Sequence, residues 1–327
     1  MPEILYHYCS GTTFASIING KCLRLCDIRK SNDEKEMSFL YPQLFNEMKA
    51  YYNSLESDCQ FYEISGYEGF SFFIDKVKND LDKKIEDGNF TSFVACFCEK
   101  GNVLSQWRVY GDDGRGFSIG FSKSALERYC STYNDVIKLV KVRYADDKEK
   151  KNIIEGEAIK LVNKIIDIYN SLSNTEEYQS AFTQYCAAVL IENSICDSLR
   201  FKSKAFEEEQ EWRLYFTNRV ELDGRMVAEK KEFSSINPYE TALLPILQTK
   251  IDHNVTADDM VAFYPIKFDE LGDQCIKKLY RGPKNKSNLT DIELFLANRK
   301  LLKEEYDRKS NRFVKSIDIS ISNISYR

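Results

Sequence analysis

Histidine is scarce in this sequence, with only His7 and His253 among 327 residues. A histidine-based catalytic triad would have to use one of these two, and no Gly-x-Ser-x-Gly nucleophile elbow accompanies them. The ten cysteines include no Cys-x-x-Cys pair, so the usual ligand spacing of a structural zinc site is missing. The residues therefore argue against a triad hydrolase and against a zinc protein.

Long apolar runs and an excess of positive charge are also missing. No window approaches the roughly 18 apolar residues of a membrane span, and the first residues do not form a basic segment followed by an apolar stretch. The net charge is −5 and the pI is near 5.4, so the whole chain lacks the basic field of a protein that binds nucleic acid mainly through phosphates. We expect a cytoplasmic protein without a membrane partner, in which a local basic groove is still allowed.

The residues that are present indicate a globular α+β protein. Hydrophobic residues make up 43% of the chain and charged residues 30%. Alternating patterns predict short strands, and four-residue periodicity predicts helices near 69–85 and from 147 to about 200. The predicted strands span 4–8, 22–28, 93–98, 117–121, 136–144, 226–233, 260–264 and 317–321. We therefore predict one domain over residues 1–327, with a helical insertion at about 147–200.

The segment from Glu209 to Phe216 joins two glutamates to a strand-like pattern. If it is extended, Glu209, Glu211 and Arg213 lie on one face, and the other face, with Trp212, is apolar. A Glu-x-Glu pair projecting from a strand is a common arrangement of catalytic carboxylates. A solvated acidic face explains the same residues, and both interpretations are open at this point.

Three further sequence features could contribute to a binding or catalytic site. His7 lies in a strand pattern, where it is either a structural hydrogen-bonding residue or a catalyst. Trp107, Arg108 and Tyr110 could stack on a nucleobase or ribose, or pack in the core. The loop 111–116 is rich in glycine, but it has no Gly-Lys-Ser/Thr and is better explained as a hairpin turn than as a phosphate-binding loop.

Several sequence blocks resemble a bacterial domain-of-unknown-function family. They are Tyr6-His-Tyr-Cys-Ser10, Leu23-Arg-Leu25, Asn32-Asp33-x-x-Glu36, Ser105-Gln-Trp-x-x-Tyr110, Gly116-Phe-Ser-Ile-Gly-Phe121, Lys202 to Arg213, and Arg281-Gly-Pro283. They span nearly the whole chain, apart from the helical region. Cys9 stands where that family usually has threonine.

The same layout resembles a divergent ADP-ribosyltransferase. This resemblance implies a mixed, mainly antiparallel sheet and NAD as the substrate that takes the place of a cofactor. It gives His7 contact with the nicotinamide ribose and makes Glu211 the catalytic carboxylate, which stabilises an oxocarbenium-like state. Glu209 would orient or deprotonate the acceptor. The middle motif has Tyr110 and Ser118 as its candidates.

The resemblance also implies a set of NAD-binding residues. Arg24 or Arg108 would neutralise the pyrophosphate, because a guanidinium binds phosphate oxygens as a fork. The full predicted NAD-binding set is His7, Tyr8, Arg24, Trp107, Arg108 and Tyr110. No metal ligand is predicted by this interpretation.

We therefore expect an NAD-dependent ADP-ribosyltransferase that modifies an intracellular protein or nucleic acid, as a bacterial toxin or phage-defence effector. A cognate antitoxin or inhibitor would be a further partner, and Lys202 and Lys204 are the basic residues closest to the Glu pair. One alternative is a non-enzymatic sensor or interaction module on the same scaffold. Another is a nuclease with magnesium held by Asp33, Glu36, Glu209 and Glu211.

Overall fold

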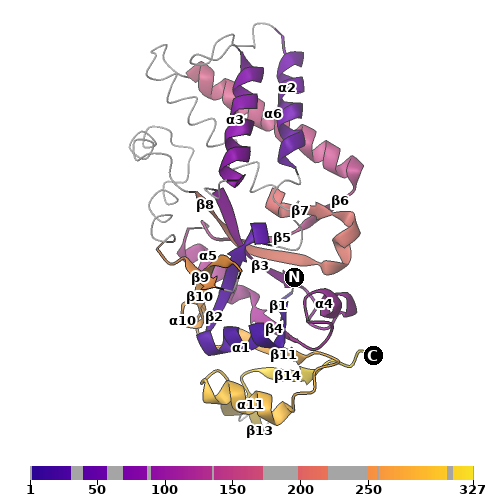
Figure 1. Ribbon diagram of the computed structural model, residues 1–327, viewed down its shortest axis with the longest axis vertical. Helices are drawn as coiled ribbons and strands as arrows, with labels where there is room; N and C mark the ends of the chain where they lie inside the picture. Colours follow the sequence, from indigo (N-terminus) through magenta and orange to yellow (C-terminus); the bar gives the residue numbers. More distant parts are fainter. Residues whose placement is uncertain are drawn as a thin grey trace.

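A computed structural model describes ten parts of the chain around one large sheet (Figure 1). The described residues are 2–30, 40–56, 69–86, 90–134, 136–171, 198–219, 247, 249–255, 258–307 and 312–326. Within them, no helix combines the length and the apolar character needed to cross a membrane.

The main sheet contains ten strands from the described residues, in the order β14-β11-β4-β1-β3-β2-β10-β9, with β8 paired to β3 and β5. Its strands are β1 (Ile4–Cys9), β2 (Cys22–Asp27), β3 (Phe90–Cys98), β4 (Phe117–Ser122), β5 (Lys138–Lys141), β8 (Glu211–Arg219), β9 (Asp252–Val255), β10 (Met260–Lys267), β11 (Ile276–Arg281) and β14 (Asp318–Ile321). Only the β11–β14 pair is parallel among these described pairings. The prediction of a mixed, mainly antiparallel sheet with helices is confirmed.

Two smaller sheets lie outside the main one. β6 (Arg143–Ala145) pairs in parallel with β7 (Phe201–Ser203), and β12 (Glu304–Asp307) pairs antiparallel with β13 (Arg312–Lys315). The β6–β7 pair matters for the site, because it joins the start of the predicted insertion to the segment that precedes β8. The two strands that bracket the predicted insertion are thus neighbours.

Strand β3 is the branch point of the main sheet. One edge pairs with β8 over the whole strand, from Phe90 opposite Arg219 to Cys98 opposite Glu211. The other edge is shared: β2 pairs near Val94, and β1 pairs only at Cys98. β1 and β2 therefore separate from each other along this edge of β3.

The two faces of the sheet are packed differently. The larger core covers one face with α1 (Gly11–Gly20), α5 (Lys123–Thr132), α10 (Phe268–Leu271) and α11 (Leu289–Asn298). On the other face, α2 (Tyr41–Ser54), α3 (Phe70–Glu86) and α6 (Asp147–Ser171) form a helical layer that packs on Val94 and Tyr215. Figure 1 shows this layer at one end of the molecule, with α1 and α11 at the opposite end.

Most predicted elements within the described residues are found. The 69–85 periodicity corresponds to α3, and the pattern at 136–144 forms two strands, β5 and β6. The side chain of Asn288 caps the N-terminus of α11 by accepting from the Thr290 amide. α6 covers the first part of the predicted insertion, while 172–197 and the predicted strand at 226–233 lie outside the described residues.

Candidate functional site

A cluster of charged side chains lies where β7, the 3-10 helix η3 (Lys204–Glu209) and the start of β8 meet. Lys202 Nζ lies 2.8 Å from Glu209 Oε2 and 3.5 Å from Glu211 Oε2. Arg213 donates to both oxygens of Glu211, with Nε at 2.8 Å from Oε1 and Nη2 at 3.1 Å from Oε2. Two cations thus balance two carboxylates.

The local backbone places the two glutamates differently. Glu209 ends η3, and Gln210 takes the left-handed conformation, with φ 45°, before β8 begins at Glu211. The expectation that Glu209 continues the strand alternation is therefore wrong, because a left-handed residue breaks the period of two. From Glu211 onward the alternation holds, and Trp212 faces the larger core as predicted. Glu209 reaches the cluster through Lys202 instead of through the strand.

Burial and charge act against each other in this cluster. Glu211 is 5% exposed and Arg213 is fully buried. Burial by itself would raise the pKa of Glu211, but Arg213, followed by Lys202, holds that pKa below its ordinary value. Burial would lower the pKa of Lys202, and the charges of Glu211 and Glu209 raise it instead. The carboxylate of Glu211 and the ammonium of Lys202 are both charged at neutral pH.

Two tyrosines complete the cluster from other parts of the chain. Tyr110 follows α4 (Leu104–Val109), is 37% exposed, and donates its hydroxyl hydrogen to Glu209 Oε1 at 3.2 Å. The Tyr144 hydroxyl in β6 accepts from the Glu211 amide at 2.8 Å. Burial, with the Glu209 charge as a further cause, raises the pKa of Tyr110, so its phenol is protonated and serves as a donor.

Cys96 marks an open position on the face that carries Glu211. It lies opposite Arg213 in the β3–β8 register and is solvent-exposed. Its thiol donates a hydrogen bond to the Glu211 carboxylate. Its neighbours on that face, Val94 and Cys98, are buried. Val94 packs under the helical layer, but this layer does not extend to Cys96, the next residue on this face.

Arg24 lies near this open position, on the neighbouring strand β2. The register of Cys26 with Val94 puts Cys26 and Arg24 on the face of Cys96 and Glu211. The Arg24 guanidinium lies 4.5 Å from the ring centre of Phe263, and its buried Nε has no hydrogen-bond acceptor within the described part of the chain. This guanidinium is a cation that could receive an anionic group at the edge of the cluster.

His7 points to the other face of the sheet. Tyr6 lies opposite Cys98, and Cys98 lies opposite Glu211, so these three share a face. His7 is offset by one residue and packs edge-on against Phe97, with ring centres 6.0 Å apart. The structure therefore does not bring His7 and Glu211 together.

The His7 ring is bonded to β3 close to where β1 and β2 separate. Its Nδ1 lies 2.9 Å from the Cys96 carbonyl oxygen, and because a carbonyl only accepts, Nδ1 carries the hydrogen. Burial lowers the pKa of His7 below its ordinary value, against the opposing effect of this hydrogen bond. The neutral ring thus ties β1 to β3 beside the open position at Cys96.

The remaining predicted NAD-binding residues are largely engaged in the protein. The Tyr8 hydroxyl donates to the Lys100 carbonyl at 2.8 Å and accepts from the Val103 amide at 3.0 Å. Trp107 is fully buried and packs edge-on against Tyr8, with ring centres 4.9 Å apart. Arg108 is exposed and lies over the ring of Tyr326 at 5.5 Å.

Within the predicted set, Tyr110 therefore contacts Glu209 directly, and Arg24 lies on the sheet face that carries Glu211. Sequence reasoning missed the role of Arg213, although alternation already placed it beside Glu211 on one face. It also missed Tyr144, for which no local signal exists because the contact spans 67 positions.

The described residues contain no group of three or more His, Cys, Asp and Glu side chains arranged to hold a metal ion. Glu209 and Glu211 are neutralised by Lys202 and Arg213, which leaves little net negative charge to attract a cation. Asp33 and Glu36, the other carboxylates of the nuclease hypothesis, lie outside the described residues.

Comparison with known proteins identifies a family match. Residues 106–214 match a family described as a protein of unknown function (DUF2971). The match runs from α4 to β8 and includes Tyr110, Tyr144, Lys202, Glu209, Glu211 and Arg213. The resemblance to a domain-of-unknown-function family is thereby confirmed over this stretch. No curated protein and no solved structure gives a significant match.

Proposed function

We propose that this chain is an ADP-ribosyltransferase that cleaves NAD at the nicotinamide bond and transfers the ADP-ribosyl group to a protein or nucleic acid. The observation that carries the proposal is the carboxylate of Glu211, held ionised beside the exposed Cys96 and linked through Lys202 to Glu209 and Tyr110. An ionised carboxylate of fixed orientation is what the oxocarbenium-like state of this reaction requires.

Glu211 supplies the negative charge in this mechanism. The Arg213 fork fixes the carboxylate plane, and Lys202 Nζ lies 3.5 Å from Oε2. As the bond between ribose and nicotinamide breaks, positive charge grows on the sugar, and a nearby carboxylate that accepts from the ribose 2′-hydroxyl stabilises it. The electron pair of the broken bond leaves with nicotinamide.

Glu209 and Tyr110 act on the acceptor side. Glu209 is hydrogen-bonded to Tyr110 and Lys202, and its side chain is 13% exposed compared with 7% for Glu211. A carboxylate at this rim can orient the acceptor nucleophile and take its proton. In this proposal His7 is a positioning residue, because it holds the Cys96 carbonyl from the opposite face.

The test measures nicotinamide released from NAD by the full chain in the presence of cell extract. Wild type is expected to release nicotinamide, and Glu211→Gln to lose about a hundredfold in rate. Glu209→Gln should keep NAD cleavage by water but lose transfer to the acceptor. The matched control is Glu208→Gln, which removes an exposed carboxylate one position away and should leave the rate unchanged.

Folding must be checked in the same variants, because Glu211→Gln leaves the buried Arg213 without its counter-charge. Circular dichroism and a thermal melt separate unfolding from loss of chemistry. Release by Glu211→Gln at the wild-type rate, or no release by folded wild type with any extract, would contradict the proposal.

A second candidate is a non-enzymatic interaction module on the same scaffold. It is favoured by the opposite orientation of His7 and Glu211 and by the pairing of both glutamates with internal cations. In that case the cluster holds the segments together and the exposed face around Cys96 and Tyr110 binds a partner. Folded wild type would then retain that partner from extract without consuming NAD.

A further inference from the structure

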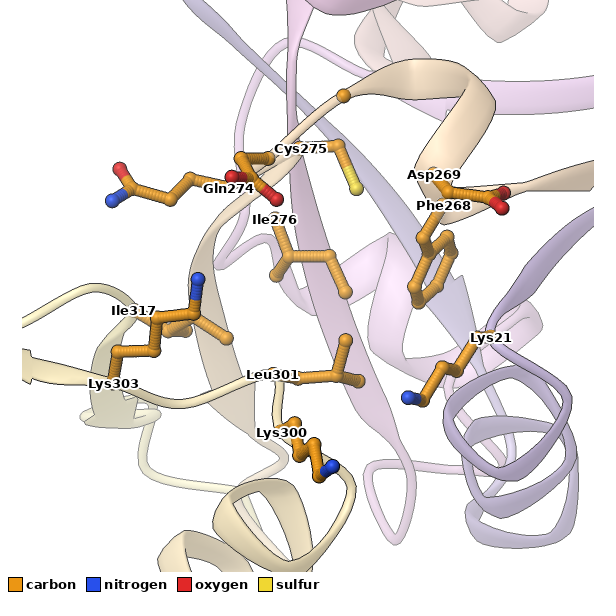
Figure 2. A pocket seen from close by; sticks show the side chains of 12 residues that line it. Lys21, Phe268, Asp269, Gln274, Cys275, Ile276, Lys300, Leu301, Lys303 and Ile317 are labelled. Carbon is orange, nitrogen blue, oxygen red and sulfur yellow. The ribbon is translucent and has the colours of Figure 1, made fainter.

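A separate cavity lies beside the larger core, near the ends of α1 and α11. Its volume is about 160 Å³, and it is bounded by the residues after α1 and α11, by α10 and the loop that follows it, and by the start of β11. The apolar part of its lining comes from Phe268, Cys275, Ile276, Leu301 and Ile317. Figure 2 shows the Cys275 sulfur directed toward Phe268, with Leu301 below them.

Three lysines stand around this apolar lining. Lys21, Lys300 and Lys303 line the cavity and are solvent-exposed, although they come from distant parts of the sequence. Figure 2 shows Lys21 and Lys300 on the Leu301 side and Lys303 beside Ile317. Within the described ranges, none of the three ammonium groups lies within ion-pair distance of a carboxylate.

A helix-end role leaves the ammonium groups of two of these lysines available. Lys21 and Lys300 follow α1 and α11 in left-handed conformations, with φ 45° and φ 60°. Cations there would offset the partial negative charge of the terminal carbonyls. No side-chain hydrogen bond from either lysine to a carbonyl occurs within the described residues, so both ammonium groups remain available to a ligand.

The remaining lining limits the chemistry further. Asp269 and Asp273 also line the cavity, so its charge is modest and a highly charged polyanion does not fit it well. Burial raises the pKa of Cys275 to about 11, which keeps the thiol neutral at pH 7 and the inner wall uncharged. A dry apolar cavity of roughly 150 Å³ is large enough for benzene. The shape therefore matches one ring or a branched alkyl group.

We propose that this cavity binds a small organic anion, with a compact apolar body among Phe268, Ile276 and Leu301 and a carboxylate or phosphate head at the lysines. Transfer of the apolar body out of water favours binding, and the head is stabilised by two or three ammonium groups that pair with no carboxylate in the described part of the chain. This site is independent of the NAD chemistry, because no residue of the Glu209–Glu211 cluster lines it.

The test is calorimetric titration of the full chain with benzoate and with phenyl phosphate. Inorganic phosphate probes the head alone, and benzyl alcohol probes the body alone. At least one of the two complete probes should bind saturably at millimolar concentration and more tightly than either part. Lys21→Ala/Lys300→Ala should weaken binding at least about tenfold. Leu301→Phe, which fills the cavity without changing its charge, should weaken binding as well.

The matched control is Lys286→Ala/Lys148→Ala, which removes two exposed lysines that do not line the cavity and should leave binding unchanged. Thermal melts confirm that each variant is folded. Absence of saturable binding by both complete probes, or binding that neither the lysine pair nor Leu301→Phe affects, overturns the proposal.

Discussion

Arg213 binds Glu211 through two parallel hydrogen bonds, Nε to Oε1 at 2.8 Å and Nη2 to Oε2 at 3.1 Å, in the interior of the protein. The remaining guanidinium nitrogen, Nη1, donates to the Leu199 carbonyl at 3.2 Å. The two residues are separated by one position on the same strand face, so β8 presents a preformed fork and carboxylate. Lys202 and the Tyr144 hydroxyl fix this pair from neighbouring segments.

Arg213→Leu should be strongly destabilising. The change leaves Glu211 buried without its bidentate partner, and breaking a buried pair from one side costs about 3–5 kcal/mol. Urea unfolding measures the loss. Arg213→Lys keeps the charge but not the fork and should lose less. As a control, Arg115→Leu removes an exposed arginine from its pair with Asp112 and should leave the unfolding midpoint nearly unchanged. Equal midpoints for Arg213→Leu and wild type would contradict the assigned role.

Acid should remove the stability that the Glu211 charge provides. Its pKa is lowered in the folded protein from the ordinary value of 4.5, where burial opposes the shift and Arg213 and Lys202 cause it. The contribution is therefore complete above the unfolded pKa and disappears as the pH falls through the folded one. The gap in unfolding free energy between wild type and Glu211→Gln should be constant near pH 7 and narrow below pH 4.5. A gap that stays constant to low pH would show that this charge is not responsible.

Asn102→Ala should loosen the segment that carries Tyr110. Asn102 Oδ1 accepts from Trp107 Nε1 at 2.9 Å and from Ser322 Oγ at 2.6 Å, and its Nδ2 donates to Asn323 at 2.8 Å. Loss of this acceptor leaves the buried indole unpaired, at a cost of about 1–3 kcal/mol. Hydrogen exchange should rise in α4, and Asn102→Asp, which retains an acceptor, should restore much of the protection. Unchanged hydrogen exchange in Asn102→Ala would show that Asn102 does not stabilise α4.

Cys96 should react with a thiol reagent in the native protein. It is exposed on β3, whereas Cys98, two residues further on the same face, is buried, and burial raises the pKa of Cys98 to about 11. Peptide mass spectrometry after brief treatment with iodoacetamide should show modification at Cys96 well ahead of Cys98. Similar modification rates at both positions would contradict the assigned difference in exposure between the two thiols. Cys98 serves as an internal control, because both thiols lie in one peptide strand.

Sequence patterns predicted side-chain burial most reliably where burial depends only on position within one strand. Alternation from Glu211 onward correctly assigned Trp212 and Leu214 to the core, because successive strand residues necessarily point to opposite faces. The same rule failed at Glu209, where the left-handed Gln210 interrupts the strand, and glutamine carries no strong signal for that conformation.

The sequence by itself determined the α+β class, most strand positions within the described residues, and the presence of a glutamate pair beside a cation. Tertiary structure decided which side chains meet that pair. Tyr110 reaches Glu209 across 99 positions, Cys96 is exposed while its neighbours are covered, and His7 turns to the opposite face. Local periodicity sets the face a residue occupies within its own strand, but strand pairing and helix placement, which depend on distant contacts, set what stands across from it.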